Sequence, residues 1–268
     1  QMYHCKTQPV YRLLQVATFT LLSFFISTTA AHAQTDFAPG QIMFTGFDSD
    51  PADAFSIVIL TDVVAGTVIY ITDRGWSNTT GYRNDTNGEG TISFTFNNDY
   101  PCGTSFNFTD VGGANDWEVR DAYGVVIGTV VIQAGGDTNG MALGSDAAGG
   151  NPQGDQLSIY QLPEPTSGNQ ASFVTMIQMD NNLALPVDND EESSLPTGLP
   201  ANTIVRFNTE VDNAKYDCSP NLGSAATIQA AITNDNGVGG LIADGSNNWQ
   251  ESNNYINLIP VCSFCCGT

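Results

Sequence analysis

Short runs of alternating apolar and polar residues, separated by turn residues, dominate this chain and restrict what it can fold into. In residues 91–96, Ile92, Phe94 and Phe96 alternate with hydroxyl side chains, so an extended strand there has one apolar face. Comparable runs occur at residues 41–47, 54–61, 67–72, 105–109, 125–132, 156–160, 172–179 and 203–207. The 27 glycines and 12 prolines favour turns between such strands. We therefore predict an all-β fold, an antiparallel β-sandwich of about nine strands.

One short helix is predicted at residues 225–232. Ser224 can cap its first turn, and Ile228, Ala231 and Ile232 fall on one face. A helix this short depends on docking against a sheet for its stability. We expect residues 34–258 to form a single β-sandwich domain, and residues 259–268 to be a cysteine-rich tail that starts a following segment.

The first 33 residues have the pattern of a secretory signal peptide. Lys6 and Arg12 give a positive start, an apolar stretch follows, and residues 31–33 read Ala-His-Ala, an A-x-A cleavage site. Cleavage there makes Gln34 the first residue of the mature chain. No later apolar stretch reaches the roughly 20 residues of a membrane span. The sequence therefore predicts a secreted protein, extracellular or at the cell surface.

Removal of the signal peptide leaves a strongly acidic chain without histidine. The two histidines of the sequence, His4 and His32, both lie in the signal peptide. Five basic residues then remain against 28 acidic ones, a formal charge of −23. Such a chain has no Ser-His-Asp or Cys-His catalytic group and no histidine to bind a metal. Its charge disfavours nucleic acid and anionic membrane surfaces as partners.

Five cysteines remain in the mature chain, so at least one has no partner within it. In an oxidising compartment most of them should pair. Cys102 with Cys218 is the simplest disulfide because the other three lie together at the C-terminus; a bond from Cys218 to that tail is the alternative. Cys262, Cys265 and Cys266 have the spacing of half a zinc site, but the sequence offers no second pair of ligands.

Carboxylates are the remaining candidates for a metal site. Asp48, Asp50 and Asp53 fall in one turn between two predicted strands, and clustered carboxylate and carbonyl oxygens are the ligands that Ca²⁺ prefers. The spacing is not that of an EF-hand, and aspartate is also an ordinary turn residue. The acidic run at residues 188–192 is a second candidate, although such runs are usually solvated. Calcium at Asp48, Asp50 and Asp53 is the cofactor that the sequence suggests.

Aromatic residues and carboxylates leave carbohydrate chemistry open. Trp76 and Tyr82 follow a predicted strand, where exposed rings can stack on sugars; the alternative is that such large side chains close the ends of the core. Glycoside cleavage needs two suitably spaced carboxyl groups and no histidine, but 28 acids do not single out a pair. Asn78, Asn84 and Asn107 each begin a glycosylation sequon.

Three segments near the N-terminus share a recognisable pattern. They read IMFTGFDSD at residues 42–50, FSIVILTD at 55–62 and GTVIYITDRGW at 66–76, and looser similarity extends to Trp249. This pattern resembles a β-rich module of large secreted or surface proteins, notably of Bacteroidetes-type bacteria. The resemblance implies a secreted β-module without an assigned activity and supplies no catalytic residues. Asp48 stands where the module usually has asparagine, and Arg74 is not typical of it.

Two functions are consistent with these observations. The first is a non-catalytic extracellular or cell-surface module for interaction or assembly, whose partner is another surface protein. The second is a domain that binds an extracellular glycan or cleaves it with carboxylates. An exposed groove lined by Trp76 and Tyr82 would favour the second function, whereas buried tryptophans would favour the first.

Overall fold

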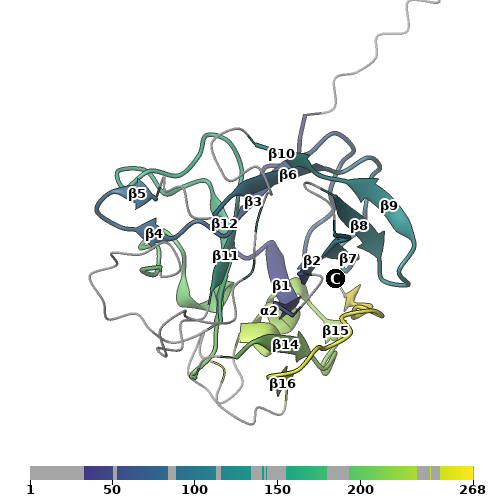
Figure 1. The fold of residues 1–268 in the computed structure, drawn as a ribbon. Coiled ribbons are helices and arrows are strands. Elements are labelled where there is room, and N and C mark those ends of the chain that lie inside the picture. The colour runs from purple at the N-terminus through teal and green to yellow at the C-terminus, as the bar shows by residue number, and fades with distance from the viewer. Residues whose placement is uncertain are drawn as a thin grey trace, which may run out of the picture. The chain divides into compact units, whose positions relative to one another are not determined.

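Two β-sheets face each other in the computed structural model of this chain (Figure 1). The structure describes residues 33–50, 53–83, 89–112, 116–133, 141, 143, 155–179, 193–209, 211–233, 242 and 248–267. Residues 34–268 form one compact unit, and the predicted signal peptide lies outside the described residues except for Ala33. The predicted all-β sandwich is confirmed.

The larger sheet has seven strands in the order β16-β14-β1-β2-β7-β8-β9, and its neighbouring strands are antiparallel. The first strand of the chain lies inside this sheet, between β2 and the late strand β14, while β9 and β16 form its edges. The strands are β1 (Ile42–Asp48), β2 (Ala54–Ile59), β7 (Ser105–Asp110), β8 (Trp117–Asp121), β9 (Val126–Thr129), β14 (Asn213–Tyr216) and β16 (Trp249–Ser252).

The smaller sheet has six strands in the order β10-β6-β3-β11-β12-β13, and only the β12–β13 pair is parallel. The strands are β3 (Val68–Thr72), β6 (Thr91–Thr95), β10 (Val131–Ile132), β11 (Gln156–Tyr160), β12 (Phe173–Gln178) and β13 (Ile204–Arg206), which follows the 3₁₀ turn η1 (Ala201–Thr203). Two short pairs lie outside both sheets: β4 (Trp76–Ser77) with β5 (Gly81–Tyr82), and β15 (Leu222–Gly223) with β17 (Cys265–Cys266).

Apolar side chains from the facing sides of the two sheets form the main core. Phe55 of β2 stacks on Phe108 of β7 with ring centroids 4.6 Å apart, and Phe94 of β6 meets the Phe108 ring edge-on. Trp117 and Trp249 are buried in the same core. The alternation of apolar and polar residues along each strand therefore directs one face of each sheet inward, as the sequence pattern predicts.

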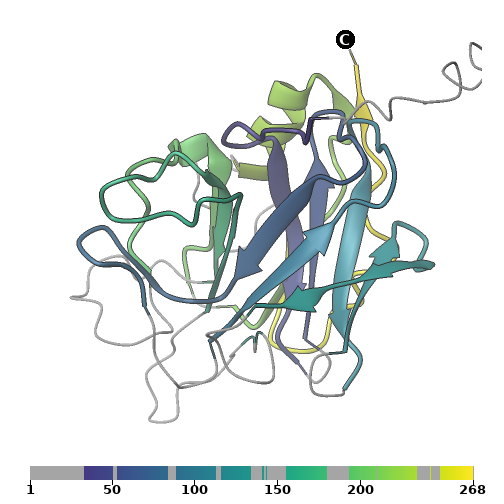
Figure 2. The ribbon, with the colours of Figure 1, turned by 90° about the horizontal axis from the view of Figure 1, so that it is seen from above.

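The predicted helix is confirmed as α2 (Ala225–Thr233). The Thr227 N–H donates to Ser224 Oγ over 3.2 Å, so Ser224 caps the first turn as expected. Ile228 and Ile232 are buried in the main core, which supplies the docking that a short helix needs. Figure 2 shows α2 and the last strand β17 at the same end of the sandwich.

The segment after β16, residues 256–266, runs over the outward face of the seven-stranded sheet, and we call it the C-terminal strap. At Gly46 in β1, an added Cβ would lie 2.9 Å from Leu258, so the close approach of the strap favours glycine there. The strap is held by hydrogen bonds from the Ile256 N–H to the Asp48 carboxylate, from Lys215 Nζ to the carbonyls of Asn257 and Pro260, and from Ser105 Oγ to the carbonyl of Cys262.

Two disulfides fix the strap, and neither is the Cys102–Cys218 bond predicted from the sequence. Cys102 is bonded to Cys266, with Cα atoms 5.8 Å apart, and Cys218 to Cys262, with Cα atoms 5.3 Å apart. The prediction was wrong because it treated residues 259–268 as a tail beyond the domain, whereas Cys262 is buried against the sheet and its carbonyl accepts a hydrogen bond from Ser105 Oγ. Cys265 is the free cysteine of the described residues and is exposed.

Candidate functional site

Trp76 and Tyr82 lie in a second apolar cluster, on the outward face of the six-stranded sheet. Trp76 is fully buried and Tyr82 is 7% exposed, so the prediction of exposed rings that stack on a ligand was wrong. The Trp76 ring meets the Tyr82 and Phe173 rings edge-on, at 5.1 and 4.8 Å. The β4–β5 hairpin folds back onto the sheet because these rings bury more surface there than in a free loop. This Trp76 cluster comprises Trp76, Tyr82, Tyr160, Phe173, Met176, Leu199 and Ile204.

Asn78 fastens the hairpin to the segment that begins at residue 193. Its Oδ1 accepts hydrogen bonds from three donors, one of them Trp76 Nε1 at 3.1 Å, and its Nδ2 donates to the Leu195 carbonyl at 2.8 Å. The amide nitrogen that a glycan would modify is therefore engaged. Asn107 is buried inside β7, and Asn84 lies outside the described residues. The sequons at Asn78 and Asn107 thus serve the fold.

A polar network that the sequence analysis does not identify lies beside this cluster. The Arg74 guanidinium lies over the Tyr82 ring, 5.0 Å from its centroid, and pairs with Glu164 at 3.3 Å. The Tyr160 hydroxyl donates to Glu164 at 3.1 Å, and the Tyr82 and Ser158 hydroxyls share a hydrogen bond of 2.5 Å. No local spacing marks this network, because its members come from segments far apart in the chain.

Both tyrosines of this network stay protonated at neutral pH. Burial raises the pKa of Tyr82 well above its usual value. Burial also raises the pKa of Tyr160, and the neighbouring Glu164 carboxylate raises it further. A neutral hydroxyl donates a hydrogen bond but is a poor nucleophile. The network is therefore suited to holding the hairpin on the sheet.

The structure does not bring Asp48, Asp50 and Asp53 together as a metal site. Asp48 is buried and accepts hydrogen bonds from the N–H groups of Asp50 and Ile256, both at 3.0 Å. The Asp50 carboxylate accepts one from Asn213 at 2.9 Å. Across the described ranges, no group of three or more histidine, cysteine, aspartate or glutamate side chains could hold a metal ion. The acidic run at residues 188–192 lies outside the described residues.

The surroundings of Asp53 disfavour the charged form of its carboxyl group. Burial raises its pKa from 3.8 to about 6, and the nearby Asp110 carboxylate adds to that rise. A hydrogen bond from the Leu143 N–H, 3.0 Å long, acts in the opposite direction. Burial raises the pKa of Asp48 as well. These acids are therefore structural groups whose ionisation the fold opposes.

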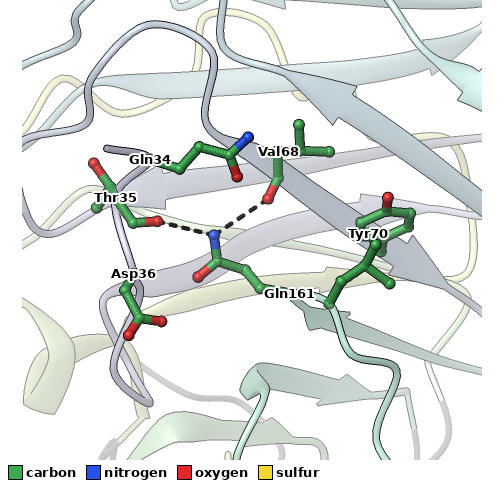
Figure 3. A pocket seen from close by; sticks show the side chains of 7 residues that line it. Gln34, Thr35, Asp36, Val68, Tyr70 and Gln161 are labelled. Carbon is green, nitrogen blue, oxygen red and sulfur yellow. Dashed lines mark hydrogen bonds between the residues drawn. The ribbon is translucent and has the colours of Figure 1, made fainter. Parts of the chain in front are cut away.

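The chain just after the predicted cleavage site is bound to the sandwich. The Thr35 N–H donates to Thr67 Oγ1 at 2.9 Å, and Thr35 Oγ1 accepts from the Val64 N–H at 3.1 Å. Gln161 Nε2 donates to the carbonyls of Thr35 and Val68, at 2.9 and 3.2 Å (Figure 3). These bonds border a hollow of about 250 Å³ lined by Gln34, Thr35, Asp36, Val68, Tyr70, Gln161 and Leu162.

Exposed apolar side chains gather at the β9 edge of the seven-stranded sheet. Tyr123 and Val125, in the β8–β9 turn, are 81% and 59% exposed, and Val126 in β9 is 48% exposed. Val111 after β7 and Val131 in β10 of the six-stranded sheet are exposed too, but they do not belong to this edge. The opposite edge, β16, differs because it reads Trp-Gln-Glu-Ser and its tryptophan is buried. The two edges therefore present different surfaces to a partner.

Comparison with protein-family models, with curated proteins and with solved structures found no match. In the part of the chain that the structure describes, no helix combines the length and apolar character that a bilayer span requires. The β9 edge and the hollow beside Gln34 are the surface features from which a function can be argued.

Proposed function

We propose that this protein is a secreted, non-catalytic interaction module whose β9 edge binds an extended, basic segment of another extracellular protein. The observation that carries the proposal is the group of exposed apolar side chains at a sheet edge that ends in β9. An edge strand presents backbone N–H and C=O groups to which a partner strand can add; in β9 the Ile127 carbonyl already accepts a hydrogen bond from Asn97 Nδ2 at 3.0 Å. Natural edges are usually protected by charge or by short length, so an apolar edge is typical of a binding surface.

Secretion is supported by the sequence and by the start of the fold. The signal pattern ends at Ala33, and hydrogen bonds to the sandwich begin at Thr35. Two disulfides, Cys102–Cys266 and Cys218–Cys262, suit an oxidising compartment. We infer that Gln34 is the mature N-terminus.

A non-catalytic role is supported by the burial of the side chains that the sequence offers for chemistry. Trp76, Trp117 and Trp249 are all buried, which removes the observation that would favour sugar stacking. Asp48 and Asp53 bind backbone N–H groups. No histidine follows His32.

The charge of the protein indicates what kind of strand would bind. The mature chain has five basic residues against 28 acidic ones, so a second copy or an acidic partner would be repelled. Near the β9 edge, Asp116 and Asp121, at the two ends of β8, add local negative charge, and Arg120 is already paired with Glu118. A partner segment that combines apolar and basic residues can therefore pack on the apolar side chains and also be attracted by the negative charge of this protein.

Synthetic peptides test the proposal directly. An eight-residue peptide of alternating valine and lysine should bind the full mature chain saturably, and its valine–glutamate counterpart should not. Hydrogen exchange should show new protection at the β9 amides when the lysine peptide is present. Exchanging Tyr123 and Val126 together for serine should weaken binding at least tenfold.

Matched variants separate edge binding from general adhesion. Leu162 and Tyr255 are 63% and 62% exposed and lie away from the β9 edge in sequence, so their exchange for serine should leave binding unchanged. Equal loss in both double variants, or protection at β16 instead of β9, would overturn the proposal. A dimer of the free protein in sedimentation would also contradict it, because the edge would then serve self-association.

A further inference from the structure

We propose that Gln34 is a modification site: once the signal peptide has been removed, its α-amino group closes on its own side-chain amide to give pyroglutamate. This inference rests on the cleavage before Gln34 proposed above. The motivating observations are the position of a glutamine directly after the Ala-His-Ala site and its exposure at the start of a bound segment.

The reaction needs no atoms beyond those of residue 34. The α-amino nitrogen attacks the side-chain carbon Cδ and forms a new C–N bond. The Cδ–Nε2 bond then breaks, and the departing nitrogen takes the proton lost by the amine and leaves as ammonia. No electrons are transferred and no co-reactant is consumed. Both groups belong to one residue, so closure benefits from their proximity.

The structure exposes the Gln34 side chain while it fixes the next residue, and cleavage after Ala33 would release the α-amino group beside that side chain. The first anchored group is the Thr35 N–H, which donates to Thr67 Oγ1 at 2.9 Å. Gln34 itself is exposed, so its amine and its amide can meet and ammonia can leave into solvent. Figure 3 shows the Gln34 side chain beside Val68 at the hollow.

The product suits this position better than the open residue does. Val68, Tyr70 and Leu162 form apolar parts of the hollow that Gln34 lines. A lactam carries no charge, so contact with such groups costs it less hydration free energy than it costs an ammonium group.

Closure also protects the hydrogen bonds that hold the N-terminus. An aminopeptidase acts on a free α-amino group, and trimming by two residues would remove Thr35. Thr35 makes three hydrogen bonds with Val64, Thr67 and Gln161. A blocked residue 34 preserves them, so the modification would keep the mature end of the chain in place.

Mass spectrometry of the exported full-length chain tests the inference. The intact mature protein should be lighter than the open-glutamine form by the mass of one ammonia, and Edman degradation should give no first residue. Treatment with pyroglutamyl aminopeptidase should restore sequencing from Thr35. The Gln34→Asn variant, which lacks the chain length for a stable lactam, should start with an open asparagine and be trimmed by an aminopeptidase that leaves the wild type intact.

The outcomes distinguish this inference from the proposal on which it rests. An open Gln34 at the N-terminus would overturn cyclisation and leave cleavage standing. A peptide that spans Ala33 and Gln34 would overturn both. A synthetic peptide that starts at Gln34 and is handled in parallel measures how much of the ring forms during sample preparation. If the peptide and the protein contain equal fractions of pyroglutamate, the ring in the protein formed during preparation and the inference is wrong.

Discussion

The two sheets are covered on their outward faces in opposite ways. The C-terminal strap lies on the seven-stranded sheet and is held by hydrogen bonds and two disulfides. The Trp76 cluster lies on the six-stranded sheet and is held by aromatic packing and the Arg74–Glu164 pair. The strap also buries Ile256, Leu258 and Phe264, but its two disulfides hold it in addition to that buried area. A non-covalent cover has to bury large side chains.

Loss of both disulfides is the strongest test of the covalent cover. Each closes a long loop, of 44 residues for Cys218–Cys262 and 164 for Cys102–Cys266. Chain entropy then stabilises the fold by about 4–5 kcal/mol per bond, close in sum to the whole stability of a domain. We expect the variant with all four cysteines changed to serine not to fold, as judged by near-ultraviolet circular dichroism.

Single bonds and the free thiol refine this test. Removing only Cys218 and Cys262 should lower the free energy of unfolding by about 4 kcal/mol in urea, whereas Cys265→Ser should change it by less than about 0.5 kcal/mol. Peptide mapping without reduction should recover the Cys102–Cys266 pair. Recovery of a Cys102–Cys218 peptide would refute the strap as described.

Trp76→Ala should give the next largest effect, because it empties the centre of the non-covalent cover. Trp76 is fully buried against Tyr82 and Phe173, so the free energy of unfolding should fall by about 3–5 kcal/mol. The exposed Tyr255→Ala is the control and should have little effect. Urea unfolding by fluorescence measures both.

Combining Trp76→Ala with the loss of Cys218–Cys262 sharpens the comparison. The two changes lie on different sheets, so their effects should add within about 0.5 kcal/mol. A larger departure from additivity would mean that the strap and the Trp76 cluster stabilise each other through the main core.

Asp53→Asn should give a smaller, pH-dependent effect on the side of the strap. The folded chain holds the Asp53 proton up to about pH 6 and the unfolded chain only to about 3.8, so ionisation destabilises the folded state as pH rises through this window. The variant keeps an oxygen for the Leu143 N–H and should exceed the wild type at pH 7 by at most about 3 kcal/mol.

The expected difference between Asp53→Asn and the wild type disappears below about pH 4, where both are uncharged at this position. Asp116→Asn, at an exposed acid, controls for the change in net charge. If the Asp53→Asn variant is less stable than the wild type at pH 7, the folded protein stabilises the charged carboxylate and the expected rise in the pKa is wrong.

Local pattern predicts much of the sandwich but not its covers. Residues 91–96 alternate strictly, and β6 forms there as predicted. The run at residues 125–132 is divided between β9 and β10, which belong to different sheets, and alternation alone carries no signal for that change. Strands β14 and β16 read Asn-Ala-Lys-Tyr and Trp-Gln-Glu-Ser, which is too short and too polar to be identified as strands from the sequence.

The site residues depend on contacts between distant segments, which one sequence does not reveal. Trp76 is buried because Phe173 and Tyr160 come to it from other strands. Cys218 pairs with Cys262 because the strap crosses the sheet, although Cys102 is an equally plausible partner by sequence. The choice between exposed and buried rings, and between disulfide partners, is thus made by tertiary packing.

The interior place of β1 governs the order in which the chain can fold. β1 pairs with β2 early in the sequence but needs β14, from Asn213 onward, on its other side. Until that late segment is available, Gly46, Phe47 and Asp48, the residues that pair with β14, form an unprotected edge that can pair with other chains. Contacts of such long range make folding slow. A newly made molecule is therefore most prone to aggregate before residues 213–216 have been made and have paired with β1.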